Sequence, residues 1–426
     1  MQSASISQLP AVSDSRLREL MSCCLQFDST SGNESAFTNF LADWAREQGF
    51  AVDLWQADER DLSGYPEARA RHLPLAGRPT AVIRWPAQRD GAGRSLMFNA
   101  HTDVVSAGDT EQWKYPPFAG RDEDGCFFGR GACDVKGPLV AALGAMLSVR
   151  DSHPDGMAGE VALELIPGEE DCVGLGTLTS VARGYQPDGL IVLEPTSNIP
   201  CSASRGGLRF EITCRGRAVH GTVKWLGRDA IRLQRHVLDV LDAMEERWND
   251  RLADRRFAAY PYARPITVDT IRGGRWQGMI CDECTCAGYF ELLPGDDPAE
   301  WQEKFRSTLF ASMNISDHGS VMITVDFREI YLGHSLSAGD PLARTAAETM
   351  RKLRGNTSVE CLPAGFNAGC EAGLRANLLG TPTLVWGPGS LEFAHAIDER
   401  IEWSEVQTAA RLFTAVAETW CVAKPD

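Results

Sequence analysis

The feature that most constrains the fold is an alternation of short apolar runs with helical patterns. Apolar runs of strand length begin near Ser95, Val161 and Gly189, and helical patterns begin at Gly137 and cover residues 173–183. Buried strands that alternate with helices predict an α/β sheet whose strands are mostly parallel. In such sheets, functional residues gather just past the carboxyl ends of the strands.

This alternation is interrupted once, near Ser204. An alternating strand pattern from Leu208 is followed by a helical pattern over 228–247, two more strands, an amphipathic helix over 298–312 and a last strand. The order β-α-β-β-α-β is typical of a ferredoxin-like α+β domain. The α/β alternation then resumes with a strand over 357–364.

The sequence therefore predicts one α/β domain, residues 1–203 and 329–426, interrupted by an inserted α+β domain over residues 204–328. The length of 426 residues agrees with two domains.

Composition excludes several classes of partner. Acidic residues outnumber basic ones by 58 to 42, which gives a net charge of −16. Because phosphate binding needs clustered Lys and Arg, we expect neither nucleic acid nor an anionic membrane surface as a partner. No run approaches 18 apolar residues, so no membrane span is expected. The first 20 residues lack the pattern of a secretory signal, and 13 scattered cysteines favour free thiols in a reducing cytoplasm.

Five short segments carry side chains suited to catalysis at predicted strand ends or in the loops beyond them. They are NAHTDVV with His101 and Asp103, GRGACDVKG with Asp134, IPGEED with Glu169 and Glu170, LEPT with Glu194, and AHAIDE with His395. Each alone has an ordinary explanation, since a single histidine is most often structural and an aspartate can cap a helix.

Together these residues point to a cation site. Imidazole and carboxylate ligands at the strand ends of one domain suit zinc, manganese or cobalt. Glu169 and Glu170 are adjacent, so their side chains diverge. One of them can bind a metal while the other accepts a proton from water.

In this order, the five segments resemble the co-catalytic metallohydrolases related to acetylornithine deacetylase, succinyl-diaminopimelate desuccinylase, aminoacylase and bacterial carboxypeptidase G. The resemblance runs from about Leu17 to Trp420. It implies a zinc-peptidase-like catalytic domain interrupted by a ferredoxin-like lid that forms a homodimer. It also implies two divalent metal ions as cofactors, zinc first, with cobalt or manganese as alternatives.

The resemblance also implies a role for each motif residue. Five residues would be metal ligands: Asp134 bridging both ions, His101 and Glu194 at one, and Glu170 and His395 at the other. Glu169 would be the general base and then the general acid, and Asp103 would accept a hydrogen bond from His101. His220, in RGRAVHG, would stabilise the oxyanion, often from the other subunit of the dimer.

Substrate contacts are suggested near the C-terminal end. The segment GCEAG, followed by PTLVWGPGS, favours the acetylornithine deacetylase branch, in which Glu371 would contact substrate. Equally, Glu371 could be a carboxylate at a helix N-terminus. Gly387 and Gly389 could offer backbone N–H groups to a substrate carboxylate, and Arg272 could contact substrate from the lid.

Besides Gly221, which follows His220 where the family usually has Ser, two positions in the inserted domain depart from the family pattern. Gly278 stands where many relatives have Asn, and Glu291 precedes LLPG where many have Arg. Both changes remove groups that help bind or frame the substrate in relatives. Simple acetylornithine hydrolysis therefore does not follow from the resemblance.

The resulting hypothesis is a cytoplasmic, dinuclear zinc-dependent hydrolase of linear amides. It would remove a small acyl group from an N-acyl amino acid or a related amine. The alternatives are a dipeptidase or carboxypeptidase of the same family, or a catalytically silent binding protein. Cys281, Cys284 and Cys286 in CDECTC resemble a second metal site, but the sequence lacks a second ligand pair at zinc-finger spacing.

Overall fold

The computed structural model describes residues 14–65, 75–88, 91–171, 174–250, 253–313, 322–353 and 364–422. The chain forms two compact units. The large unit comprises Met1–Ala203, His334–Phe366 and Cys370–Asp426, and the inserted unit comprises Ser204–Gly333 and Asn367–Gly369. The strand expected over 357–364 lies, except for Ala364, outside the described residues.

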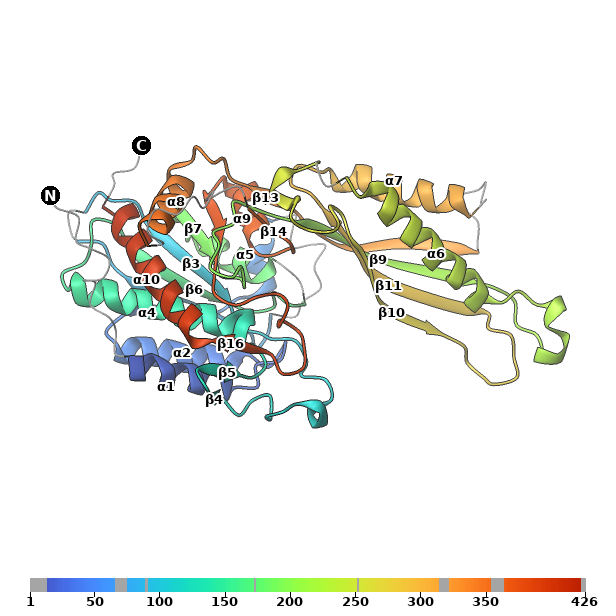
Figure 1. Cartoon of the computed structure of the whole chain (residues 1–426), viewed down its shortest axis with the longest axis horizontal. Helices are drawn as coiled ribbons and strands as arrows, with labels where there is room; N and C mark the ends of the chain where they lie inside the picture. The colour runs from blue at the N-terminus through green and yellow to red at the C-terminus, as the bar shows by residue number, and fades with distance from the viewer. Residues whose placement is uncertain are drawn as a thin grey trace. The chain divides into compact units, whose positions relative to one another are not determined.

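The large unit is built on a six-stranded sheet of order β1-β2-β6-β3-β7-β15 (Figure 1). Its strands are β1 (Ala51–Gln56), β2 (Pro79–Trp85), β3 (Leu96–His101), β6 (Val161–Ile166), β7 (Gly189–Val192) and β15 (Thr383–Val385). The pairs β3–β6, β3–β7 and β7–β15 are parallel, whereas β1–β2 and β2–β6 are antiparallel. The central strands β3, β6 and β7 are buried along their whole length, as expected when helices cover both faces of a parallel sheet. The predicted α/β fold with a mostly parallel sheet is confirmed.

Helices and two small sheets complete this unit. The helices are α1 (Asp14–Leu25), α2 (Ser35–Glu47), α4 (Gly137–Ser152), α5 (Leu175–Ala182), α8 (Pro341–Leu353), α9 (Ala372–Leu379) and α10 (Trp403–Trp420). One small sheet has the order β16 (Arg400–Glu402), β5 (Cys126–Phe128), β4 (Arg121–Glu123), and the other β13 (His334–Ser335), β8 (Ala203–Ser204), β14 (Gly365–Phe366).

Helix α4 lies in the centre of the core, packed on β3 and β6 with α10 beside it (Figure 1). Residues 137–149 of α4 are all buried, which suits a helix that is apolar on every side. The helical stretch Ala132–Ser152 is long and apolar enough to cross a membrane, but its most apolar 18 residues, with a mean hydropathy of 1.4, are all buried inside this unit, as in core helices.

A buried ion pair connects α9 to the sheet. The Arg375 guanidinium lies 2.5 Å from the Glu164 carboxylate on β6, and both side chains are fully buried. Asn99 on β3 donates a further hydrogen bond of 2.7 Å to Glu164. Removing one member of such a pair leaves the other charge buried without its partner, which is strongly destabilising.

We expect Arg375→Ala to lower the free energy of unfolding by about 3–5 kcal/mol in urea denaturation. Lys352→Ala is the control, because Lys352 forms an exposed pair with Glu348 on α8. It should change stability by less than about 0.5 kcal/mol. Equal effects of the two substitutions would contradict a structural role for the buried pair.

The inserted unit has the predicted β-α-β-β-α-β order. Its elements are β9 (Gly206–Arg215), α6 (Ala230–Trp248), β10 (Ile266–Gly273), β11 (Glu283–Leu292), α7 (Pro298–Ser312) and β12 (Ile323–Tyr331). They form an antiparallel sheet of order β10-β11-β9-β12, with α6 and α7 over one face (Figure 1). Aromatic rings such as Trp248, Phe290 and Phe305 fill the core between helices and sheet. The ferredoxin-like fold expected for this segment is therefore present.

The last strand of this unit runs beyond the boundary expected at residue 328. In β12 the register with β9 shifts between Phe327 and Ile330, and pairing then continues to Tyr331 opposite Gly207. A bulge of this kind breaks the period-two alternation of side chains, so it resembles a strand end in the sequence. The inserted unit ends at Gly333 instead, and residues 367–369 also belong to it.

The cysteines of the described residues are all free thiols, and most of them are buried. Burial raises the pKa of Cys214 to about 12 and that of Cys286 to about 11. Since metals bind the thiolate, such neutral thiols are poor ligands. Among the described residues, the group of side chains close enough to hold a metal ion contains no cysteine. The three cysteines of CDECTC are thus buried side chains at and just before the start of β11.

Candidate metal centre

The predicted ligands of the large unit lie where its strands and loops converge. His101 is the last residue of β3, the glutamate pair 169–170 follows β6, and Glu194 follows β7. Asp134 lies in the irregular turn before α4, and His395 lies in the loop between β15 and β16. Parallel strands bring their carboxyl ends to one edge of the sheet, which is why residues so distant in sequence meet here.

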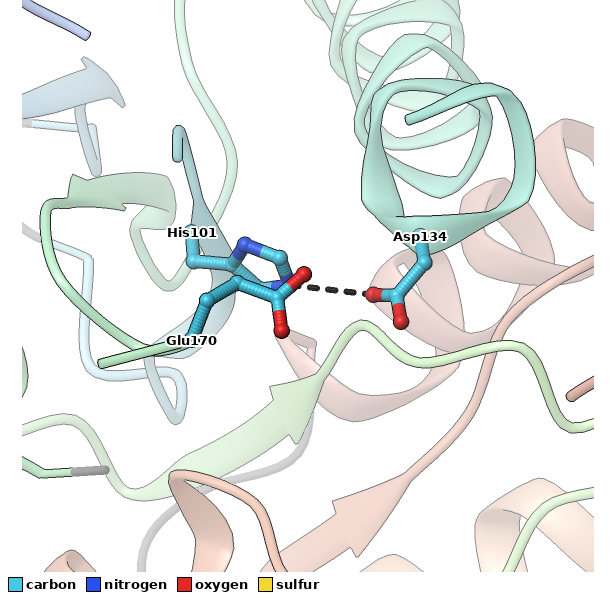
Figure 2. A group of neighbouring side chains, drawn as sticks. All are labelled: His101, Asp134 and Glu170. Carbon is cyan, nitrogen blue, oxygen red and sulfur yellow. Dashed lines mark hydrogen bonds and ion pairs between the residues drawn. The ribbon is translucent and has the colours of Figure 1, made fainter. Parts of the chain in front are cut away.

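Asp134 lies between the two imidazoles. Its Oδ1 is 3.1 Å from Nε2 of His101, and its Oδ2 is 3.4 Å from Nε2 of His395. His395 Nε2 is also 3.1 Å from Oε2 of Glu170. One ligand atom from each of His101, Asp134 and Glu170 lies within 4.8 Å of the others, and Figure 2 shows these three side chains pointing toward one another. The structure therefore brings four of the expected ligands together, with Asp134 in the central position.

Glu169 and Glu194 also belong to this cluster, because their carboxyl groups interact electrostatically with those of its other members. Both are buried, and burial raises their pKa values well above the usual range. The negative charges of neighbouring carboxylates add to the rise, Glu170 acting on Glu169 and Asp134 acting on Glu194. Carboxylates that perturb each other in this way share one low-dielectric site.

The two histidines carry the compensating positive charge. Burial alone would lower the pKa of His395, but hydrogen bonds to Asp134 and Glu170 outweigh it and raise the pKa to about 11. Burial likewise works against ionisation of Asp134, yet its bonds with both imidazoles hold the pKa of that carboxyl below its usual range. An anionic, nitrogen- and oxygen-lined site of this kind fits a divalent cation such as zinc, cobalt or manganese.

Asp103 holds the turn that carries the glutamate pair. Its carboxylate accepts backbone N–H bonds from Gly168 at 2.8 Å, Glu169 at 3.2 Å and Glu170 at 3.1 Å. The hydrogen bond expected from His101 goes instead to the main-chain carbonyl of Asp103, at 2.9 Å, while the nearer carboxylate oxygen is 3.8 Å away. Because the amides already occupy the carboxylate, it orients Glu169 and Glu170, and the carbonyl orients the imidazole.

Comparison with known proteins agrees with this geometry. The model of peptidase family M20/M25/M40 matches residues 97–419. The chain belongs to this family. It is 25% identical over 422 residues to N-formyl-4-amino-5-aminomethyl-2-methylpyrimidine deformylase of Bacillus subtilis, covering 92% of this chain and 91% of the relative. It is 26% identical over 399 residues to acetylornithine deacetylase of Proteus mirabilis, covering 93% and 92%.

The fold is shared with solved M20 structures. The YXEP protein of Bacillus subtilis, described as a dinuclear metal-binding peptidase of family M20, superposes with a TM-score of 0.63 at 15% identity. The match covers 96% of this chain and 98% of that one. The expected resemblance to deacylating metallohydrolases is confirmed at the level of family and fold.

Glu371 has a structural partner in this M20 chain. Its side chain is buried, and its carboxylate accepts the backbone N–H of Gly174, directly before α5. Of the two expectations for Glu371, this bond favours the carboxylate at a helix N-terminus, where a negative charge is stabilised. The helix whose N-terminus Glu371 contacts is α5. Glu371 itself lies directly before a different helix, α9, which packs against α5.

The two glycines expected to bind a substrate carboxylate do not have free amides. The N–H of Gly387 donates to Oγ1 of Thr196 at 3.1 Å, and that of Gly389 donates to Oε2 of Glu405 at 2.9 Å. Glycine is required at 387 for a different reason, because a Cβ there would lie 2.5 Å from the carbonyl oxygen of Glu194. The turn therefore supports the segment that carries Glu194.

His220 and Arg272 belong to the inserted unit, and both are exposed. The backbone N–H of Thr222 donates to Nδ1 of His220, so a neutral imidazole carries its proton on Nε2. His220 thus presents an outward-facing donor, beside a hollow that Trp276 and Gly278 also line. Substrate contact by either residue stays a prediction.

One residue that sequence reasoning overlooked closes the AHAIDE segment. Glu399 is buried and accepts hydrogen bonds from the turn that carries Asp134. The signal was available in the sequence, because an acidic residue stands four positions after a predicted ligand in a motif of the family.

Glu291 is an unusual buried carboxylate in the inserted unit. Burial raises its pKa to about 8, and the charge of the nearby Arg205 only partly opposes the rise. The folded protein therefore binds a proton that the unfolded chain releases between an ordinary carboxyl pKa near 4.5 and about 8. The stabilising contribution of the protonated group is present at low pH and is lost as the pH rises toward 8.

We expect Glu291→Gln to be more stable than the wild type at pH 8, by up to about 4 kcal/mol, and the difference to shrink toward pH 5. Glu283→Gln, at the exposed start of the same strand, is the control and should shift stability equally at all three pH values. Urea denaturation at pH 5, 6.5 and 8 measures both. A pH-independent difference for Glu291→Gln would contradict the buried, protonated carboxyl.

Proposed function

We propose that this chain is a metal-dependent amide hydrolase that removes a small acyl group from an amine or an amino acid. The observation that carries the proposal is Glu169, a buried carboxylate in the same cluster as the ligands His101, Asp134 and Glu170 and bonded to none of them. The named activities of the similar proteins, a deformylase and a deacetylase, support this reaction class.

The residues divide the work between binding and proton transfer. Asp134 would be shared by two divalent cations, with His101 and Glu194 on one side and Glu170 and His395 on the other. Such cations, zinc in our proposal, would polarise the amide carbonyl and acidify water. The dinuclear relative of the same fold supports two ions.

Glu169 would carry the proton. It accepts one proton from the attacking water, whose oxygen bonds to the carbonyl carbon, and later delivers it to the amine as the C–N bond breaks. The products are a carboxylate and an amine. Burial raises the pKa of this carboxyl, which favours the protonated form that must later deliver the proton to the amine.

The inserted unit favours a substrate without a carboxylate near Glu291. A buried, protonated carboxyl at that position lacks the positive charge of the Arg found in many relatives, and Gly278 supplies no side-chain amide, so neither group would attract a substrate carboxylate. N-acyl amines, including N-formyl aminomethylpyrimidines of the kind named for the Bacillus subtilis relative, therefore rank before N-acetyl amino acids. A dipeptidase or carboxypeptidase would have the same chemistry at the cluster and would need peptides as its best substrates.

Turnover of a substrate panel tests the proposal. We expect zinc- or cobalt-loaded protein to hydrolyse N-formyl or N-acetyl amines, and Glu169→Gln to lower kcat by about 10²–10⁴-fold with unchanged metal content. Chelation should abolish activity, and added metal should restore it. Activity that survives chelation would contradict a metal-dependent hydrolase, whereas metal binding without turnover of any amide or dipeptide would indicate a silent binding protein.

We further propose that the chain acts as a homodimer through the inserted unit, where it would be a lid, in the cytoplasm. Large apolar side chains are exposed there, with Trp225 at 73% and Trp276 at 80%. Burying such side chains between two copies would remove apolar surface from water. The free buried cysteines support a reducing compartment.

Sedimentation should give twice the mass of one chain. We also expect His220→Ala to lower kcat by about 10²–10³-fold, because a donor to the oxyanion is lost, with metal content unchanged. Gln277→Ala, which lines the same hollow, is the control. A monomer with undiminished activity would contradict the dimer, and full activity of His220→Ala would contradict its role as a donor.

A further inference from the structure

The ligands Asp134 and His395 come from segments about 260 residues apart, and one side chain joins the two. Glu399 lies four residues after His395 in the same loop and is 1% exposed. Its carboxylate reaches the turn that carries Asp134. The two ligands therefore have a common support that is not itself within the metal group.

The carboxylate of Glu399 is fully engaged by that turn. Its Oε1 accepts the backbone N–H of Cys133 at 3.0 Å and of Asp134 at 3.1 Å, and its Oε2 accepts that of Gly131 at 2.9 Å. The Arg130 guanidinium donates to Oε2 at 2.7 Å and neutralises the charge. Charge-assisted bonds of this kind are stronger and more directional than neutral ones.

Further bonds fasten the two segments together around Glu399. Gly129 donates its N–H to the carbonyl oxygen of Glu399 at 2.9 Å, and Arg130 also reaches the carbonyl of Ala396 at 3.3 Å. The side chain of Asp134 can rotate only about a backbone fixed in this way. Asp103 does the same for the turn of Glu169 and Glu170, so two buried carboxylates, each binding three amides, hold two ligand-bearing turns.

We infer that Glu399 is a positioning residue that sets the affinity of the metal centre by fixing the backbone of Asp134 relative to the His395 loop. The inference rests on the proposed metal-dependent function. Partners of metal ligands typically change metal affinity by about 10–100-fold when they are removed. Glu399 would act through the main chain of Asp134, the ligand proposed to be shared by both ions. Its loss should therefore weaken the binding of both ions together.

Cobalt binding to the metal-free protein tests this without relying on activity. Apo wild type and Glu399→Gln are titrated with Co²⁺, and the visible absorption of bound cobalt is recorded. In Glu399→Gln an amide NH₂ replaces one acceptor, so it must face a backbone N–H. We expect at least tenfold weaker binding of cobalt at both positions, an altered absorption band and a lower kcat at saturating metal, with the circular dichroism of the wild type.

The matched control is Asp188→Asn. Asp188 also accepts a backbone N–H, from Ser95 at 2.8 Å, but at the start of β3, the opposite end of the strand that His101 ends. It should bind cobalt like the wild type. Glu399→Asp is measured as well, because it keeps the charge but cannot span all three amides, and it should give an intermediate affinity even if Glu399→Gln does not fold.

The outcomes distinguish failure of the proposed metal-dependent function from failure of the positioning role of Glu399. Wild type that binds no cobalt would overturn the proposed function itself. Wild type that binds cobalt while folded Glu399→Gln or Glu399→Asp binds it equally well, with the same spectrum, would overturn the role of Glu399 alone. Weakening in Asp188→Asn equal to that in the Glu399 variants would show a general loss of stability and would also contradict the inference.

Discussion

Mutual repulsion among buried carboxylates is the constraint on which the large unit depends. Asp134, Glu169, Glu170 and Glu194 share one low-dielectric site, where burial and the charges of neighbouring carboxylates raise the pKa values of the three glutamates. A cluster of this kind is stable only with compensating positive charge, which the two imidazoles supply in part and which bound cations would supply in full. The same crowding of buried carboxylates that would favour binding of a cation therefore destabilises the folded chain without one.

The fold meets this constraint with rigid backbone. The buried central strands fix where His101 and the following turns begin, and the apolar helix α4 fixes the end of the turn of Asp134. The segment of Glu194 is supported by close packing. Gly387 lies against the carbonyl oxygen of Glu194, where any side chain would clash. Ligands held in this way need little reorganisation on binding, which favours both affinity and defined geometry.

The sequence allowed the large-scale fold to be predicted, and it allowed the residues that meet in the candidate metal centre to be singled out, because strand–helix alternation and motif spacing are local signals. The same signals do not report hydrogen-bond partners. Asp103 was correctly placed beside His101, yet its carboxylate binds the amides of 168–170, which only the tertiary arrangement brings there. Gly387 and Gly389 likewise looked available for substrate until the packing of Thr196 and Glu405 against them was known.

Boundaries failed for a similar reason. The bulge in β12 breaks the alternation that marks a strand, so the predicted end of the inserted domain fell inside it. Spacing could single out Glu399 but not its bonds, because most of its partners are backbone amides, which every sequence possesses.

The free cysteines have a consequence for how the protein reacts with reagents. Burial raises the pKa of Cys24, Cys201 and Cys421 to about 12, so at neutral pH these groups are protonated and shielded from solvent. Alkylating agents attack the thiolate, and therefore reach such residues only when the surrounding structure opens. Cysteines distributed through both cores make the rate of alkylation a built-in reporter of local opening in each unit.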